Sequence, residues 1–366
     1  MTTDHLSTAS AAIDAGRGRL ARMIADRHYE LQPALADRDG ERGRARCLED
    51  VELHLSQLSQ ALAISAPSLF GDYVAWAKVL FAGLGLPPDD LKRHLEIMRD
   101  TLVDELPGGA GEAAREYVDV ALRRLPESPS ELPPVIDAAA PHGNLARRYL
   151  DALLAGDRHA ASRLVLDAAD AGVSVRDLYT YVFEPSQYEV GRLWQMGLIT
   201  VAQEHFCTAS TQLVMSQLYP RVFSGARDGR RLVATCVAEN LHEIGLRIVS
   251  DFFEMEGWQT FYLGANAPAA AVAREVAERR ADLLLVSATV ASQLRAVADL
   301  VAAVRATPGA RDVKVLVGGA PFNAVPDLWR RVGADGWASN PREALAVASA
   351  LVAGRGGEPP AVATSP

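Results

Sequence analysis

Cysteine is scarce in this chain of 366 residues, and so are the patterns that cysteines usually form. Cys47, Cys207 and Cys236 lie far apart and make no CxxC pair, which excludes a disulfide framework and a structural zinc ribbon. No stretch approaches the roughly 20 unbroken apolar residues of a membrane-spanning helix. The segment MTTDHLSTAS contains no basic region followed by an apolar run, so no secretory signal is predicted. These absences predict a cytoplasmic protein without a membrane partner.

Positive charge is not in excess either. The formal net charge is −9 and the pI is about 5.5, whereas a protein that binds duplex DNA usually needs a basic face. Direct DNA binding by this chain is therefore not expected. The composition, 49% hydrophobic and 23% charged, is that of a globular protein. A chain of 366 residues is long for one domain, so two or three domains are expected.

The first part of the chain, residues 10–126, has the pattern of an all-helical domain. Apolar residues recur at helical spacing in LEDVELHLSQLSQALAI and SLFGDYVAWAKVLFAGLG, and PPDDLKRHLEIMRDTLVDEL opens like a helix N-terminus. We expect a sensory domain here, for which a globin-like fold is one option. A linker rich in Pro and Ser is predicted at 127–141.

Two further domains are predicted after the linker. Residues 142–222 contain four helical segments separated by turns, which predicts a four-helix bundle. Residues 228–354 alternate nearly continuous apolar strands with helices, which predicts a Rossmann-like, doubly wound parallel α/β domain. Residues 355–366 are expected to form a flexible tail. The predicted fold class is thus α plus α/β.

Open parallel sheets bind ligands beyond the carboxyl ends of their strands, and small or polar residues occur at three such ends. They are Asn240, His242, Gly245, Ser287, Thr289, Gly318 and Gly319. The first turn is not GxGxxG and has no acidic cluster, which disfavours a dinucleotide clamp and a phosphoacceptor domain. Taken singly, His242 could be a surface histidine and the glycine pair an ordinary turn. Together, the three strand ends predict a slot for a flat group, with His242 as a ligand to the metal of a large cofactor.

This set, N-x-H-x-x-G with S-x-T and G-G, resembles the cobalamin-binding domain, whose usual signature is D-x-H-x-x-G with S-x-L or S-x-T and G-G. The resemblance implies that His242 is the lower axial cobalt ligand, in place of the cofactor's benzimidazole. It also implies that the nucleotide tail lies beside the serine, the threonine and the glycines, and that residues 142–222 cap the upper face. The usual aspartate is Asn240 here, which predicts a weaker or more switchable His–cobalt bond.

The bundle carries a second pattern, in which Trp194 is followed after nine residues by Glu204 and His205. It resembles the W-x9-E-H pattern of adenosylcobalamin-dependent light sensors. The resemblance implies that Trp194 shields the 5′-deoxyadenosyl group, that Glu204 holds it, and that His205 ligates cobalt after light breaks the cobalt–carbon bond. Without the cobalamin pattern, Trp194 would be interpreted as bundle core and the Glu-His pair as a solvated helix edge.

The three-part arrangement resembles the photocobilins, light sensors that use biliverdin together with cobalamin. The resemblance implies a bilin near the junction of front domain and cap, with Arg147 and Arg148 as candidate partners for its propionates and Cys47 as a candidate anchor. Solvated arginines and a buried thiol are the simpler interpretations. An aromatic stripe in the front domain is either core or a wall for a planar pigment. The stripe comprises Phe70, Tyr73, either Trp76 or Ala77, and Phe81, and His54 and His94 lie elsewhere in the domain.

The sequence therefore predicts a photoreceptor, not itself an enzyme, that binds adenosylcobalamin and biliverdin. Its signal is expected to pass through a light-dependent homo-oligomer or to a partner protein that the sequence does not identify. The main alternative is a corrinoid methyl carrier of a methyltransferase system, which shares the layout of bundle and sheet. A cobalamin subunit of a mutase and a haem-based helical sensor joined to a cobalamin domain are the remaining alternatives.

Overall fold

The computed structural model describes residues 3–223, 227–325 and 327–353. The chain divides into two compact units, Met1–Leu132 and Pro133–Pro366. Their boundary lies inside the predicted linker at 127–141, whereas the predicted tail at 355–366 lies outside the described residues. None of the helices in the described ranges is long and apolar enough to cross a membrane.

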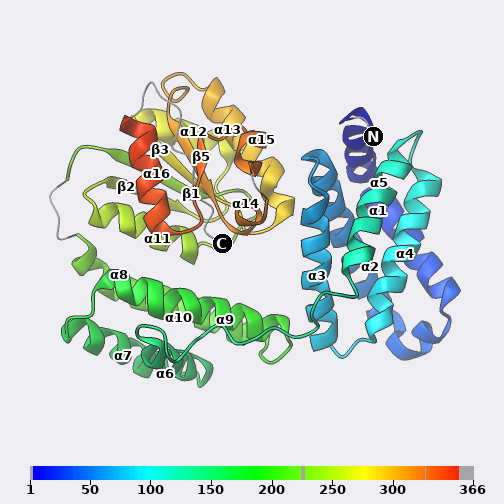
Figure 1. The fold of residues 1–366 in the computed structure, drawn as a ribbon, viewed down its shortest axis with the longest axis horizontal. Helices are drawn as coiled ribbons and strands as arrows, with labels where there is room; N and C mark the ends of the chain where they lie inside the picture. The colour runs from blue at the N-terminus through cyan, green and yellow to red at the C-terminus, as the bar shows by residue number, and fades with distance from the viewer. Residues whose placement is uncertain (1–2, 224–226, 326, 354–366) are drawn as a thin grey trace. The chain divides into compact units, whose positions relative to one another are not determined.

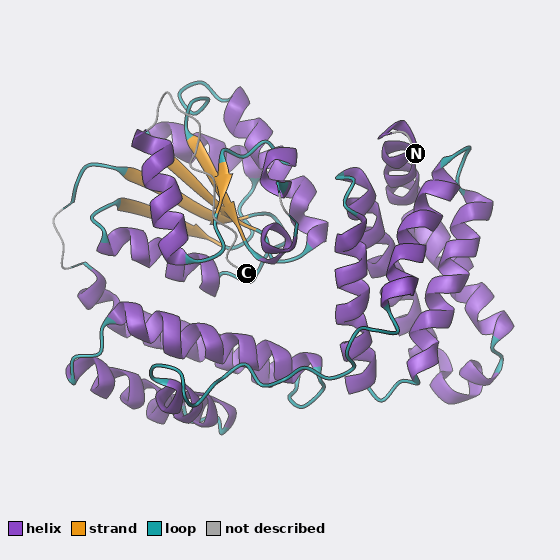
Figure 2. Cartoon of the chain, viewed as in Figure 1, coloured by secondary structure: helices purple, strands orange, loops and turns teal. Residues whose placement is uncertain are grey.

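The first unit is helical throughout, as the periodicity predicts (Figures 1 and 2). Its helices are α1 (Thr3–Leu31), α2 (Ala34–Ala63), α3 (Pro67–Gly83), α4 (Pro88–Glu105) and α5 (Ala110–Arg124). Prolines open α3 and α4, where a missing N–H group costs no helical hydrogen bond. Helix α2 is kinked at Gly40, whose φ of 61° glycine adopts at little cost. The helices begin at residue 3, earlier than the predicted domain start at residue 10.

The second unit begins with the predicted bundle. Its helices are α6 (Gly143–Leu154), α7 (Arg158–Asp170), α8 (Val175–Leu178), η1 (Tyr179–Phe183), α9 (Glu184–Gln195) and α10 (Val201–Val222). The segment η1 is a π-helical turn that joins α8 to α9, so these three parts form the third helix of the predicted four. Such turns are rare and occur often at functional sites. We refer to this bundle as the cap.

A five-stranded parallel sheet follows the cap (Figure 2). Its strands, in the spatial order β2-β1-β3-β4-β5, are β1 (Arg231–Cys236), β2 (Gln259–Gly264), β3 (Leu283–Ser287), β4 (Lys314–Gly318) and β5 (Gly336–Trp337). The strand order reverses between β1 and β3, and doubly wound folds bind their ligands at such a reversal. The predicted α/β fold is confirmed.

Helices cover the sheet on both faces (Figure 1). They are α11 (Ile244–Met255), α12 (Ala269–Arg279), α13 (Leu294–Ala306) and α16 (Pro341–Ala353). The short helices α14 (Ala320–Ala324) and α15 (Leu328–Arg331) were not predicted, because four or five residues are too few to show a helical period. A one-turn 3-10 helix, η2 (Ala291–Gln293), precedes α13.

The cap packs on the α/β domain through helix α11. Ile244, Ile248 and Phe252 of α11 belong to the same buried apolar cluster as the core of the cap. Within this contact, the hydroxyl of Tyr179 in η1 donates a 2.8 Å hydrogen bond to the carboxylate of Asp251 in α11. Burial raises the pKa of Asp251 to about 6, while the Tyr179 hydrogen bond acts in the opposite direction because it stabilises the ionised form.

We expect the variant Tyr179→Phe to lose stability in a pH-dependent way. In the folded protein the pKa of Asp251 is about 6, whereas its ordinary pKa is 3.8. The Asp251 carboxylate is therefore a buried charge only above about pH 6. Removing the donor should therefore cost about 1.5–3 kcal/mol at pH 8 and about 1 kcal/mol at pH 4.5. The midpoint of thermal unfolding, measured at both pH values, tests this.

The matched control is Tyr149→Phe. The Tyr149 hydroxyl is also buried, but its partner is the neutral hydroxyl of Thr211 at 2.9 Å. Its loss should cost a similar amount at both pH values. Equal pH dependence in the two variants would contradict the role assigned to Asp251.

Candidate functional site

The structure brings the three predicted strand ends together at one edge of the sheet. Cys236 at the end of β1 pairs with Ser287 of β3, and Ser287 pairs with Gly318 of β4. The next residue after β3, Ala288, donates a 3.1 Å backbone hydrogen bond to the carbonyl of Gly318. The segments carrying His242, Thr289 and the glycine pair therefore start from neighbouring positions, as parallel pairing requires.

Asn240 holds the loop after β1 in place. Its side chain is fully buried, and its Nδ2 donates to the carbonyl of Ser287 at 3.1 Å. Its Oδ1 accepts from the backbone N–H of His242 at 3.0 Å and from the hydroxyl of Thr289 at 3.2 Å. The amide thus positions the backbone of the metal-ligand candidate instead of its ring. An aspartate could not make the same set of bonds, because a carboxylate has no hydrogen to donate to the Ser287 carbonyl.

His242 itself is exposed, directly before the start of α11. Within the described residues, its imidazole makes no hydrogen bond or ion pair, so both ring nitrogens are available to a ligand. The preceding residue, Leu241, has 71% of its surface exposed. A single exposed leucine is ordinary on a protein surface, so the feature that suits a metal here is the exposed imidazole.

Steric crowding explains why Gly318 and Gly319 are glycines, and the sequence alone could not reveal it. Gly319 has a φ of 111°, and a Cβ atom there would lie 1.9 Å from the carbonyl oxygen of Ala288. At Gly318, a Cβ would lie 3.3 Å from the carbonyl oxygen of Ala338. These glycines let the ends of β3, β4 and β5 approach one another closely. By contrast, the predicted residue Gly245 is exposed and has open space around it.

Glu243 was missed by the sequence analysis. Its Oε1 accepts a 2.7 Å hydrogen bond from Gln212 of the cap helix α10, and its Oε2 accepts one of 3.0 Å from the hydroxyl of Tyr262 on β2. Burial and the neighbouring Glu243 both raise the pKa of Tyr262, which keeps this hydroxyl a donor. A residue next to His242 therefore couples the cap to the sheet. No local signal reveals this, since both partners are distant in the sequence.

The cap residues of the W-x9-E-H pattern lie on the two arms of the α9–α10 turn. Trp194 is half-buried near the end of α9. In the first turn of α10, the Glu204 carboxylate is 2.6 Å from His205 Nδ1 and accepts a 2.9 Å bond from the hydroxyl of Thr208. The His205 side chain is 75% exposed, although it is paired with this carboxylate.

Exposed apolar side chains occur on α9, in the α9–α10 turn and at the start of α10. They are Tyr188, Leu198 and Val201, each more than half exposed. An apolar surface with an acid–histidine pair beside it is the kind of surface that a large cofactor or another protein covers. The exposed His205 and its pairing with Glu204 fit the simpler interpretation of a solvated helix edge as well.

The residues proposed for a bilin lie in both units. Arg147 and Arg148 are exposed on α6. In the first unit, the rings of Phe70, Tyr73 and Trp76 follow one another at centroid spacings of 6.1 Å. The aromatic stripe continues to a histidine, since the Tyr73 hydroxyl is 2.6 Å from Nδ1 of His54.

Comparison with known protein families agrees with the second unit's geometry. Residues 230–346 match the B12 binding domain family, and residues 145–219 match a further family of the same description. The second unit is a cobalamin-binding module. The second match corresponds to the cap and the first to the α/β domain.

Relatives match the same module. Monomethylamine corrinoid protein 1 of Methanosarcina mazei is 29% identical over 208 residues, which are 55% of this chain and 94% of the relative. The dimethylamine corrinoid protein of Methanosarcina barkeri is 32% identical over 141 residues, 38% of this chain and 64% of the relative. The solved structure of the M. barkeri monomethylamine corrinoid protein is 24% identical, and its fold superposes with a TM-score of 0.50 over 58% of this chain and 99% of that chain.

Two consequences follow for the cobalamin-binding module. The relatives are named as corrinoid proteins, which agrees with the expectation that this chain is not itself an enzyme. Nearly all of the M. mazei protein is matched by little more than half of this chain, and both B12 binding domains lie in the second unit. The first unit is therefore an addition to the module that these proteins share.

Proposed function

We propose that His242 binds the cobalt of cobalamin from below and that the cofactor's nucleotide tail lies beside Ser287, Thr289 and the glycine pair. The support is an imidazole that is exposed and without a protein partner among the described residues, on a loop fixed by Asn240. A neutral imidazole is a good ligand for a late transition metal. Asn240 positions this ligand by holding its backbone, and Glu243 ties the same loop to the cap.

We further propose that the whole chain is a light sensor. Adenosylcobalamin would supply a cobalt–carbon bond that visible light breaks. The observation that carries this proposal is the α9–α10 turn, with Trp194 on one arm and the paired Glu204 and His205 on the other. Trp194 would pack on the adenosyl group and Glu204 would accept its hydrogen bonds. His205 would leave Glu204 and ligate the metal after illumination.

The signal in this proposal is a change of the cap. Loss of the adenosyl group would leave the apolar side chains of the α9–α10 turn uncovered. Burying them again requires either a movement of the cap or an interface with a second copy of the chain. A light-dependent homo-oligomer is the proposed output, with a further partner protein downstream.

Biliverdin is the proposed second chromophore. The support is the stripe formed by Phe70, Tyr73 and Trp76 in the first unit, two of whose rings are only half-buried, and its polar end at His54. Half-buried aromatic faces are suited to stacking on a planar pigment. A bilin band retained after gel filtration of the full-length chain with biliverdin would support this assignment.

The second candidate is a corrinoid methyl carrier, and the comparisons favour it over the sensor. The relatives reported above are named for monomethylamine and dimethylamine, and the match covers 94% of the M. mazei monomethylamine protein. In this case His242 would have the same role, while the cap would open to admit a methyltransferase. The methyl-carrier proposal assigns no function to the first unit.

Absorption spectra of the full-length chain with adenosylcobalamin, taken in the dark and after green light, distinguish the two candidates. A sensor should convert to a new stable spectrum, keep its cobalamin, and change its elution volume in gel filtration. The variant His205→Ala should lose the stable light form, whereas His159→Ala, an exposed histidine of α7, should not. Release of cobalamin on illumination at an unchanged elution volume would overturn the sensor and leave the carrier.

A further inference from the structure

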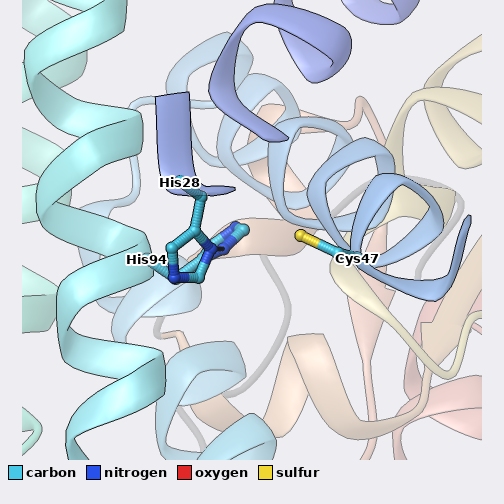
Figure 3. Close-up of side chains that lie close together, drawn as sticks. All are labelled: His28, Cys47 and His94. Atoms are coloured by element: carbon cyan, nitrogen blue, oxygen red, sulfur yellow. Dashed lines mark hydrogen bonds between the residues drawn. The ribbon is translucent and has the colours of Figure 1, made fainter. Parts of the chain in front are cut away.

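Three buried histidines meet inside the first unit. His28 comes from α1, His54 from α2 and His94 from α4, and all three are at least 94% buried. The ring centroids of His28 and His94 are 5.1 Å apart, as are those of His54 and His94. Cys47 approaches from α2, and Figure 3 shows its sulfur pointing toward the imidazoles of His28 and His94.

The donor atoms of this cluster lie close together. One ligand atom from each of His28, Cys47 and His94 lies within 4.8 Å of the other two. Nδ1 of His94 is 3.2 Å from Nδ1 of His28, and the two atoms share a hydrogen bond in the absence of a metal. Two nitrogens bound tetrahedrally to one zinc ion at about 2.0–2.1 Å would be about 3.3 Å apart. The two imidazoles therefore already have the separation of two ligands on one metal.

The charge state of the cluster also suits a metal. Burial lowers the pKa of His54 to about 4, and burial together with the neighbouring histidines lowers the pKa of His94 well below its usual value. These rings are neutral at pH 7, so each presents a nitrogen lone pair.

We propose that His28, Cys47 and His94 form a binding site for a zinc-type transition-metal cation in the first unit, separate from the cobalamin site. Two imidazoles and one thiolate are ligands that zinc and similar metals prefer, and magnesium and calcium do not. Three protein ligands leave the fourth tetrahedral position to water. Cys47 is half-buried, which gives the ion a path from solvent. The bound metal would fasten α1, α2 and α4 to one another.

Zinc binding to the full-length chain tests the proposal. The protein is reduced, stripped with a chelator and titrated with Zn²⁺ against a competing zinc indicator. One equivalent should bind to the wild type, and Cys47→Ser and His94→Gln should each weaken that site by at least about 10-fold. His159→Gln, with an exposed histidine of the cap, is the matched control and should bind as the wild type does.

Thiol reactivity gives a second readout that needs no buried substitution. Cys207 and Cys236 are fully buried, so the fast reaction with a disulfide reagent should report Cys47. Zn²⁺ should slow this reaction at least about 10-fold, and a chelator should restore it. Equal zinc binding by wild type and Cys47→Ser, or a thiol reaction that Zn²⁺ leaves unchanged, would overturn the proposal. Because Cys47 is only half-buried, Cys47→Ser should fold even if His94→Gln does not.

Discussion

Replacing His242 by alanine should weaken cobalamin binding by at least about 100-fold. The reason is the loss of the proposed cobalt ligand, since changing residues that only contact a metal's ligands already weakens metal binding by about 10- to 100-fold. Any cofactor that still binds should show the spectrum of cobalamin with its own benzimidazole on cobalt. Equilibrium binding of cobalamin, followed by absorption in the dark, measures both effects.

The fold of the His242→Ala variant should be intact. The side chain is exposed and makes no hydrogen bond within the described residues, so its removal should change the unfolding midpoint of the cofactor-free protein by no more than a surface substitution does. His159→Ala is the control for the loss of an exposed histidine. An unchanged spectrum and affinity in His242→Ala would show that His242 does not ligate cobalt, which would refute the lower-ligand assignment for methyl carrier and sensor alike.

The periodicity of the sequence was sufficient to predict the fold of the second unit. Strands such as Leu283–Ser287 are buried along almost their whole length, and a short, fully apolar run bounded by turns is typical of a strand inside a parallel sheet. Once the sheet is parallel, the carboxyl ends of its strands must lie at one edge. That geometric rule is why Asn240, Ser287 and Gly318 could be grouped without coordinates.

The contacts that tie the parts of each unit together could not be predicted in this way. Glu243 meets Gln212 and Tyr262, and Tyr179 meets Asp251, across sequence separations that no local pattern encodes. The role of Asn240 is a further example. The sequence analysis considered only its effect on the His–cobalt bond, whereas in the structure its amide bonds the backbone of Ser287 and His242.

The histidine cluster of the first unit was missed for the same reason. His28, His54 and His94 lie on three different helices, and each looks like an isolated polar residue on an apolar face. The low cysteine count excludes a zinc ribbon, which supplies its ligands in close pairs, but it does not address a site assembled from separate helices. Only helix packing places Cys47 beside His28 and His94.

Substitutions of Gly319 and Gly245 should separate the effect on folding from the effect on cofactor binding. In Gly319→Ala, the new Cβ would lie 1.9 Å from the carbonyl oxygen of Ala288, at a φ of 111° that alanine rarely adopts. The ends of β3 and β4 would have to move apart. We expect a loss of more than about 3 kcal/mol in unfolding free energy, with cobalamin binding lost as a consequence.

Gly245→Ala should show the opposite combination. Apart from its chain neighbours and its own helix backbone, no atom lies within 4 Å of the position that its Cβ would occupy. Alanine is favoured over glycine in a helix by about 0.5–1 kcal/mol, so the cofactor-free protein should unfold at the same temperature or higher. If the first turn of α11 contacts the cofactor, the added methyl group should nevertheless weaken cobalamin binding by about 10-fold or more. Thermal unfolding and cobalamin titration of both variants measure the two effects independently. Normal cobalamin affinity in Gly245→Ala would place the cofactor away from the start of α11, whereas normal stability in Gly319→Ala would mean that the β3 and β4 loops are not held at the spacing that requires glycine.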